Sequence, residues 1–95
     1  MDLPVRIEFG EGEQYSGKTF DVSTGGVFVP MSKVKDGLQT QSCKVYLDIG
    51  TKELCLKAQV VRTTQANGRY PAGVGLRFDN PNLANRFQIS QVVHA

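Results

Sequence analysis

The sequence predicts an all-β fold, a small six-stranded antiparallel barrel of Greek-key type that is followed by a short C-terminal α-helix. Apolar and polar residues alternate over short stretches, as in strands that bury one face. Turns rich in glycine and proline separate these stretches at short intervals. No helical pattern lies between them, so we expect antiparallel neighbours, and closure into a barrel removes the edges of the sheet.

Length and composition indicate a single domain over residues 1–95. A hydrophobic content of 40% with 21% charged residues is typical of a globular chain rather than a disordered one. No apolar run approaches the length of a membrane span, and the first residues lack the basic and apolar segments of a signal peptide. We therefore expect a cytoplasmic protein, or a piece of a larger one, without membrane insertion.

The charged residues argue against some classes of partner. Eleven basic residues face nine acidic ones and are scattered along the chain, which gives a net charge of +2. Nucleic-acid-binding proteins usually gather basic residues in one stripe, so nucleic acid is not the expected partner. This small net charge is compatible with a ligand that is a small anion held by a few arginines. Cys43, Cys55 and His94 form no metal-ligand pattern, and we predict neither a metal nor a cofactor.

The first three strands are expected at about 3–9, 17–22 and 26–30. The first two form a hairpin across the polar turn 10–13, and the third is wholly apolar until Pro30 ends it. Residues 31–41 lack periodicity and are expected to be a loop. The core-facing residues of the first strand are Val5, Ile7 and Phe9.

A second hairpin is expected from strands at about 43–49 and 54–64. Cys43 is in phase with the core-facing residues of its strand, whereas Cys55 is out of phase with those of the partner strand. The two thiols should therefore lie on opposite sides of the sheet and remain free. The core-facing residues are Val45, Leu47, Ile49, Leu54, Leu56, Ala58 and Val60.

A turn at 65–69 leads to the last strand, at about 72–78. Val74, Leu76 and Phe78 face inward in this strand, while Gly73, Gly75 and Arg77 face outward. The outward glycines favour a close backbone approach within the barrel over a ligand platform.

A helix is expected at about 81–92, with Asn80 as its N-cap and Pro81 as its first residue. Its apolar stripe should cover one opening or flank of the sheet. The stripe consists of Leu83, Phe87 and Val93, with Ile89 or Ser90.

No catalytic arrangement emerges from the sequence. Ser23 lies near Asp21, but a serine nucleophile needs a base within hydrogen-bond reach. His94 is the only imidazole, and nothing in the sequence brings it near Ser23. No pair of carboxylates is arranged for acid–base chemistry, so we predict that the protein is not an enzyme.

The most distinctive stretch is Asp21-Val22-Ser23-Thr24-Gly25-Gly26, between two strands. Asp and Ser side chains fix tight turns by bonding nearby backbone N–H groups. Glycine permits a positive φ or the close approach of another group. The simplest interpretation is a hairpin turn. The stretch also resembles the Asp-x-Ser-x-x-Gly signature of PilZ domains, with Asp21, Ser23 and Gly26 in the signature positions.

The resemblance to the PilZ family extends over nearly the whole chain. Leu-Pro-Val-Arg at 3–6 is similar to the family's first strand, and Val-Val-Arg at 60–62 and Gly-Val-Gly-Leu-Arg-Phe at 73–78 are similar to two later strands. The resemblance implies a six-stranded barrel with a C-terminal helix. It also implies a bacterial module that senses the second messenger cyclic di-GMP and passes the signal to an effector protein or a fused domain.

The resemblance also implies a set of ligand contacts. Asp21 and Ser23 would contact a guanine edge, Gly26 would permit the turn, and lesser candidates for phosphate or base contact are Arg6, Arg62 and Arg77. The family's site usually includes an Arg-x-x-x-Arg motif just before the first strand, and this sequence shows none there. We therefore expect this chain to bind cyclic di-GMP weakly. It would be either a domain of a longer protein or a divergent member of the family.

Two alternatives remain. One is a PilZ-like protein-interaction module that binds no nucleotide. The other is a small β-barrel that binds single-stranded nucleic acid, which requires exposed aromatic side chains along a basic groove. The pattern instead assigns four phenylalanines to the core, namely Phe9, Phe28, Phe78 and Phe87.

Overall fold

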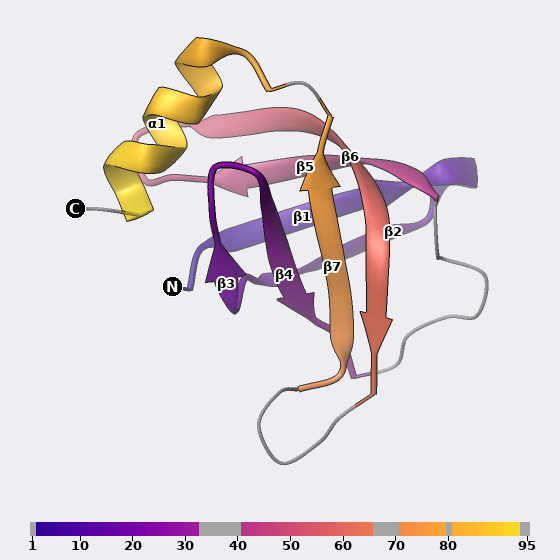
Figure 1. The fold of residues 1–95 in the computed structure, drawn as a ribbon. Helices are drawn as coiled ribbons and strands as arrows, with labels where there is room; N and C mark the ends of the chain where they lie inside the picture. Colours follow the sequence, from indigo (N-terminus) through magenta and orange to yellow (C-terminus); the bar gives the residue numbers. More distant parts are fainter. Residues whose placement is uncertain (1, 33–40, 66–70, 80, 94–95) are drawn as a thin grey trace.

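The structure, a computed structural model, describes residues 2–32, 41–65, 71–79 and 81–93 (Figure 1). This part of the chain forms seven strands, a 3₁₀ turn (Gly10–Gly12) and one α-helix. The strands are β1 (Pro4–Phe9), β2 (Gln14–Lys18), β3 (Asp21–Val22), β4 (Gly26–Pro30), β5 (Ser42–Asp48), β6 (Glu53–Thr64) and β7 (Gly73–Phe78), and the helix is α1 (Leu83–Val93). The predicted loop 31–41 and turn 65–69 lie mostly outside the described residues.

All the strands belong to one antiparallel sheet, in the order β2-β1-β5-β6-β7-β4-β3. The sheet curls into a half-barrel (Figure 1), which confirms the predicted fold class. The two edges of the sheet approach each other. The contact between them is a hydrogen bond of 2.9 Å, which the Tyr15 hydroxyl of β2 donates to the carbonyl oxygen of Pro30 at the end of β4.

The strand count is seven rather than the predicted six, because the predicted strand 17–22 is divided. Thr19 belongs with β1, since its N–H donates to the Leu3 carbonyl and its hydroxyl accepts from the Leu3 N–H, both at 2.9 Å. The next N–H, that of Phe20, donates to Phe28 in β4 at 2.9 Å. The chain thus changes its pairing partner between residues 19 and 20. Residue propensities are similar on both sides of this point, so the sequence pattern did not reveal it.

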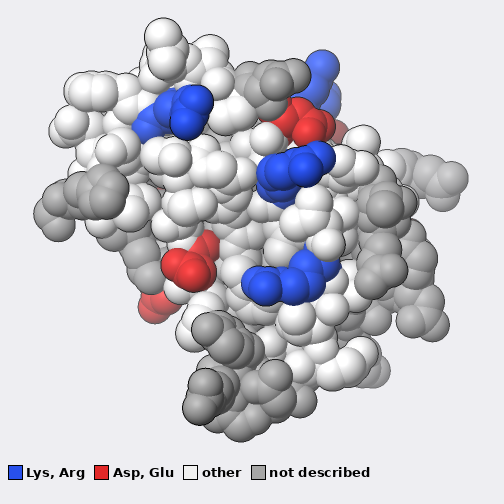
Figure 2. Space-filling model, in the orientation of Figure 1, with Lys and Arg blue, Asp and Glu red and all other residues white. Residues whose placement is uncertain are grey.

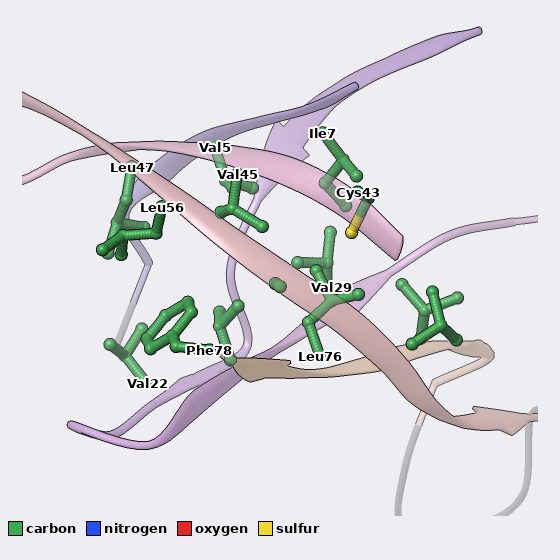
Figure 3. Packing of buried hydrophobic residues seen from close by; sticks show 14 of the residues in the cluster. Val5, Ile7, Val22, Val29, Cys43, Val45, Leu47, Leu56, Leu76 and Phe78 are labelled. Carbon is green, nitrogen blue, oxygen red and sulfur yellow. The ribbon is translucent and has the colours of Figure 1, made fainter. Parts of the chain in front are cut away.

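The concave side of the sheet encloses the core (Figure 3), and the face patterns predicted for β1, β5, β6 and β7 are confirmed. Cys43 is buried opposite Ala58, whereas Cys55 is exposed opposite Tyr46, so the thiols lie on opposite faces as predicted. The core consists of Val5, Ile7, Phe9, Val22, Val27, Val29, Met31, Cys43, Val45, Leu47, Leu54, Leu56, Ala58, Val60, Val74, Leu76, Phe78 and Ile89.

A β-bulge interrupts the pairing of β6 with β7 between Val60 and Arg62. Even-numbered residues of β6 face the core as far as Val60. The extra residue, Val61, reverses this phase, as bulges do. Arg62 consequently lies opposite Gly75 and faces outward, although its even number would otherwise direct it into the core.

The predicted helix is present, but its buried face differs from the prediction. Ile89 is buried and Val93 packs against the core, whereas Leu83 and Phe87 are 83% and 64% exposed. Positions 87 and 89 lie about 200° apart around a helix, so one sheet surface cannot cover both. The N-cap is Asn82, whose Oδ1 accepts the Asn85 N–H at 2.7 Å, while the predicted cap, Asn80, lies outside the described residues.

The helix lies at one end of the curled sheet, beyond the C-terminal end of β7 (Figure 1). None of the helices in the described ranges is long and apolar enough to span a bilayer.

Candidate ligand-binding groove

The outer face of the sheet, opposite the core, carries an open groove of about 510 Å³ where the β3–β4 turn meets β6 and β7. Five of the six predicted site residues line it: Asp21, Ser23, Gly26, Arg62 and Arg77. They come from three parts of the sequence that the sheet order brings together. Figure 2, which views this face, shows basic side chains over β6 and β7 and an acidic patch over β3.

Ser23 organises the β3–β4 turn. Its N–H donates to the Gly26 carbonyl at 2.9 Å, and its hydroxyl oxygen accepts the N–H groups of Gly25 and Gly26 at 3.3 and 3.2 Å. The hydroxyl also donates to the Gly26 carbonyl at 3.3 Å. The serine therefore holds the backbone of the turn, as the residue pattern predicted. The Gly25 carbonyl accepts the Phe78 N–H at 2.9 Å, which attaches the turn to β7.

Gly26 is required for a reason other than a positive φ. The described glycines with positive φ are Gly12 and Gly50, so the central turn needs none. A Cβ atom at Gly26 would instead overlap the carbonyl oxygen of Leu76 in β7. The glycine thus allows β4 to approach β7 closely, which is the second of the two roles considered for a glycine at this position.

Asp21 presents its carboxylate to the groove. It lies in β3 opposite Phe28, and its side chain is exposed. Within the described ranges, no hydrogen bond or ion pair engages this carboxylate. Both oxygens are therefore available as acceptors for a ligand.

An aromatic ring forms part of the groove's lining. Phe28 lies opposite Gly75, and its Cζ is only 2.9 Å from where a Cβ of Gly73 would be. The ring therefore covers Gly73, which the backbone of Val29 and Pro30 also approaches closely, so the predicted close backbone approach is confirmed at this glycine. Phe20, 42% exposed, meets it edge-on with the ring centroids 6.2 Å apart.

Phe28 is buried as predicted, but on the outer face of the sheet and outside the core cluster. Val27 and Val29 face the core, and side chains alternate along a strand, so the residue between them must face outward. The outward orientation of Phe28 could have been identified from the sequence, because three consecutive apolar residues cannot all face the core and the glycine-rich strand 73–78 offers room on the outer face.

Two arginines line the β6–β7 side of the groove. The Arg62 guanidinium lies 5.5 Å from the centroid of the Phe28 ring, within the range of a cation–π contact. The side chain also lies over Gly75, where an added Cβ would be 3.4 Å from its Cβ and Nε. Arg77 donates from Nη2 to the Gln59 Oε1 at 3.2 Å. Both arginines are exposed, so their remaining donors face solvent.

The sixth predicted residue, Arg6, lies outside this groove. Its guanidinium is 3.8 Å from the centroid of the Tyr46 ring and forms an ion pair of 3.7 Å with Glu8. These partners belong to β1 and β5, so the structure does not bring Arg6 together with the other candidates.

Comparison with known proteins identifies the fold and the family of the chain. A solved structure described as the crystal structure of the PilZ domain of CeSA from a cellulose synthesizing bacterium superimposes with a TM-score of 0.71 and 25% sequence identity, over 99% of this chain and 91% of that chain. No curated protein matches the sequence. A family model described as PilZ domain matches residues 1–95. The chain therefore belongs to the PilZ domain family.

Proposed function

We propose that this chain is a regulatory module that binds cyclic di-GMP in the groove between the β3–β4 turn, β6 and β7. PilZ domains are typically receptor modules for this nucleotide and are not enzymes. The observation that carries the proposal is the convergence of the Asp21 carboxylate with Arg62 and Arg77 in one groove. The proposal includes a bacterial, cytoplasmic location and a partner that is an effector protein or a fused domain.

The groove offers complementary groups for each part of the nucleotide. A guanine edge presents N–H donors, which match the two acceptor oxygens of Asp21. The planar guanidinium of Arg62 suits stacking on a base, and the nearby Phe28 ring keeps it in place. Arg77 suits a phosphate, because its fork of donors matches phosphate oxygens.

Ser23 acts in this proposal as a positioning residue, because its hydroxyl bonds within the turn. Ser23→Ala should weaken binding, and Ser23→Thr should largely restore it by supplying a hydroxyl. A change in the affinity with little change in the melting temperature would distinguish this role from a general contribution to folding.

Calorimetric titration with cyclic di-GMP tests the proposal. Asp21→Asn and Arg62→Gln should each weaken binding by about 10- to 100-fold, since a hydrogen bond to a charged group contributes about 1.5–3 kcal/mol. Glu53→Gln and Lys52→Gln are matched control variants, because both residues are exposed and line no part of the groove. The proposal is wrong if the folded protein gives no binding heat, or if the groove variants bind as the controls do.

A protein-interaction module that binds no nucleotide is the second candidate. The exposed side chains of Leu83 and Phe87, one turn apart on α1, favour it, because large apolar side chains gathered at a surface often mark protein contacts. A folded chain that fails to bind cyclic di-GMP in the titration would favour this candidate. Binding in the groove would favour the receptor.

A further inference from the structure

A second hollow, of about 680 Å³, adjoins the groove between the end of β7 and the start of α1. The two hollows share Gly25 and Arg77, so a ligand can extend from one into the other. The second hollow is also lined by Thr24, Phe78, Asp79, Pro81 and Arg86. It thus adds one arginine, from a different element, to the cations of the groove.

The packing of α1 directs Arg86 toward this hollow. Ile89, three residues further along, is buried in the core. Residues three apart lie about 60° from each other around a helix, so Arg86 lies beside the buried face rather than on the solvent side. Its N–H donates to the Asn82 carbonyl at 3.0 Å, within the first, capped turn. The backbone that carries Arg86 is therefore fixed next to the end of β7.

The charges in the hollow favour an anion. Within the described ranges, the Arg86 guanidinium has no hydrogen bond or ion pair, and Arg77 uses Nη2 on Gln59. Asp79 is the acidic residue that lines the hollow, and no ion pair within 4.0 Å joins it to either arginine. Two guanidinium groups against one carboxylate leave a net positive charge.

We propose that Arg77 and Arg86 form an anion subsite, which binds a phosphate group of the nucleotide whose base lies in the adjoining groove. This inference rests on the proposed function for the identity of the nucleotide. Guanidinium groups pair with phosphate oxygens in a planar, often bidentate geometry. The subsite would supply cationic contacts from the C-terminal helix.

The affinity for cyclic di-GMP, measured at several salt concentrations, tests the role of Arg86. Arg86→Gln should weaken binding about tenfold or more and make its salt dependence shallower, because one phosphate contact is lost. The melting temperature should not change, since the side chain is exposed. Asp79→Asn should tighten binding, because it removes a repulsive charge. Lys52→Gln serves as the control, since it removes a positive charge outside both hollows.

Inorganic pyrophosphate separates the subsite from the proposed function. In NMR spectra of the whole chain, it should shift the side-chain Nε–H signals of Arg77 and Arg86, and Arg86→Gln should remove the response at Arg77 or reduce it. If pyrophosphate produces these shifts but cyclic di-GMP does not bind, the anion subsite stands and the nucleotide is wrong.

The opposite result overturns the subsite. If cyclic di-GMP binds wild type and Arg86→Gln with equal affinity, and pyrophosphate shifts neither arginine, the receptor function stands without the subsite. If neither compound binds, both proposals are wrong.

Discussion

Gly26→Ala tests whether close contact of β4 with β7 sets the shape of the groove. The new Cβ would overlap the Leu76 carbonyl oxygen, which is backbone and cannot rotate away. Relief requires the strands to separate next to the pairing of Gly26 with Arg77. Overpacking of this kind costs about 1–3 kcal/mol, and we expect the upper half of that range. A domain of 95 residues has a stability of about 5–14 kcal/mol, so the variant should still fold.

Thermal unfolding measures this effect. A loss of about 2–3 kcal/mol should lower the melting temperature by about 10–20 °C in a domain of this size. Gly25→Ala is the matched control, because a Cβ there has nothing within 4 Å and the residue has no positive φ. Its stability should change by less than about 1 kcal/mol. If the two variants melt alike, or Gly25→Ala is the less stable, the close-approach argument is refuted.

Four further predictions concern the core, the two thiols, the pH dependence of stability and the ligand. Leu47→Ala or Leu56→Ala should destabilise by roughly 2–5 kcal/mol in denaturant melts, whereas Lys44→Ala should cost little; the reverse order would contradict the assigned faces. Mass spectrometry should find Cys43 and Cys55 as free thiols, and an intramolecular disulfide would contradict the β5–β6 register. Burial, and then Asp79, raise the pKa of Cys43 to about 11, so its thiol stays neutral in the folded state while it ionises in the unfolded chain near pH 9.0. Stability should therefore fall between about pH 9 and pH 11, and Cys43→Ala should flatten that slope; an unchanged slope would contradict the assignment. Fusing an Arg-x-x-x-Arg segment ahead of β1 should tighten cyclic di-GMP binding by about two to four powers of ten, and tight binding by the chain as given would show that its own arginines complete the phosphate site.

The sequence predicted the sheet best where alternation was regular. In β5 and β6, every residue predicted to face the core from Cys43 to Val60 is buried, apart from the half-buried Ile49. A slip of one residue would turn every apolar side chain to the other face, and the short loop expected at 50–53 limits larger slips, so the hairpin followed from the pattern. The signature residues Asp21, Ser23 and Gly26 were located by their spacing, and the fold brings them into one groove.

The failures share a physical cause, since each depends on long-range packing that a local pattern does not contain. The change of partner at Thr19 depends on hydrogen bonds to β1, which is distant in sequence. Phe28 faces outward, where Gly73 of β7 leaves room for its ring. Phe87 is exposed because the helix docks through Ile89 instead. Sequence reasoning did not single out Arg86, which the proposed anion subsite adds, because only the docked helix places it in the same hollow as Arg77.

Mapping the contacts of cyclic di-GMP by backbone amide NMR tests the central claim most directly. The receptor account predicts that increasing ligand shifts the signals of the β3–β4 turn, including Ser23 and Gly26, together with those of Arg62 and Arg77. Signals near Arg6 and Tyr46 on β1 and β5 should remain in place, because those residues lie outside the groove. Shifts confined to β1 and β5, or no shifts at all from a folded chain, would contradict the assignment of the groove as the nucleotide site.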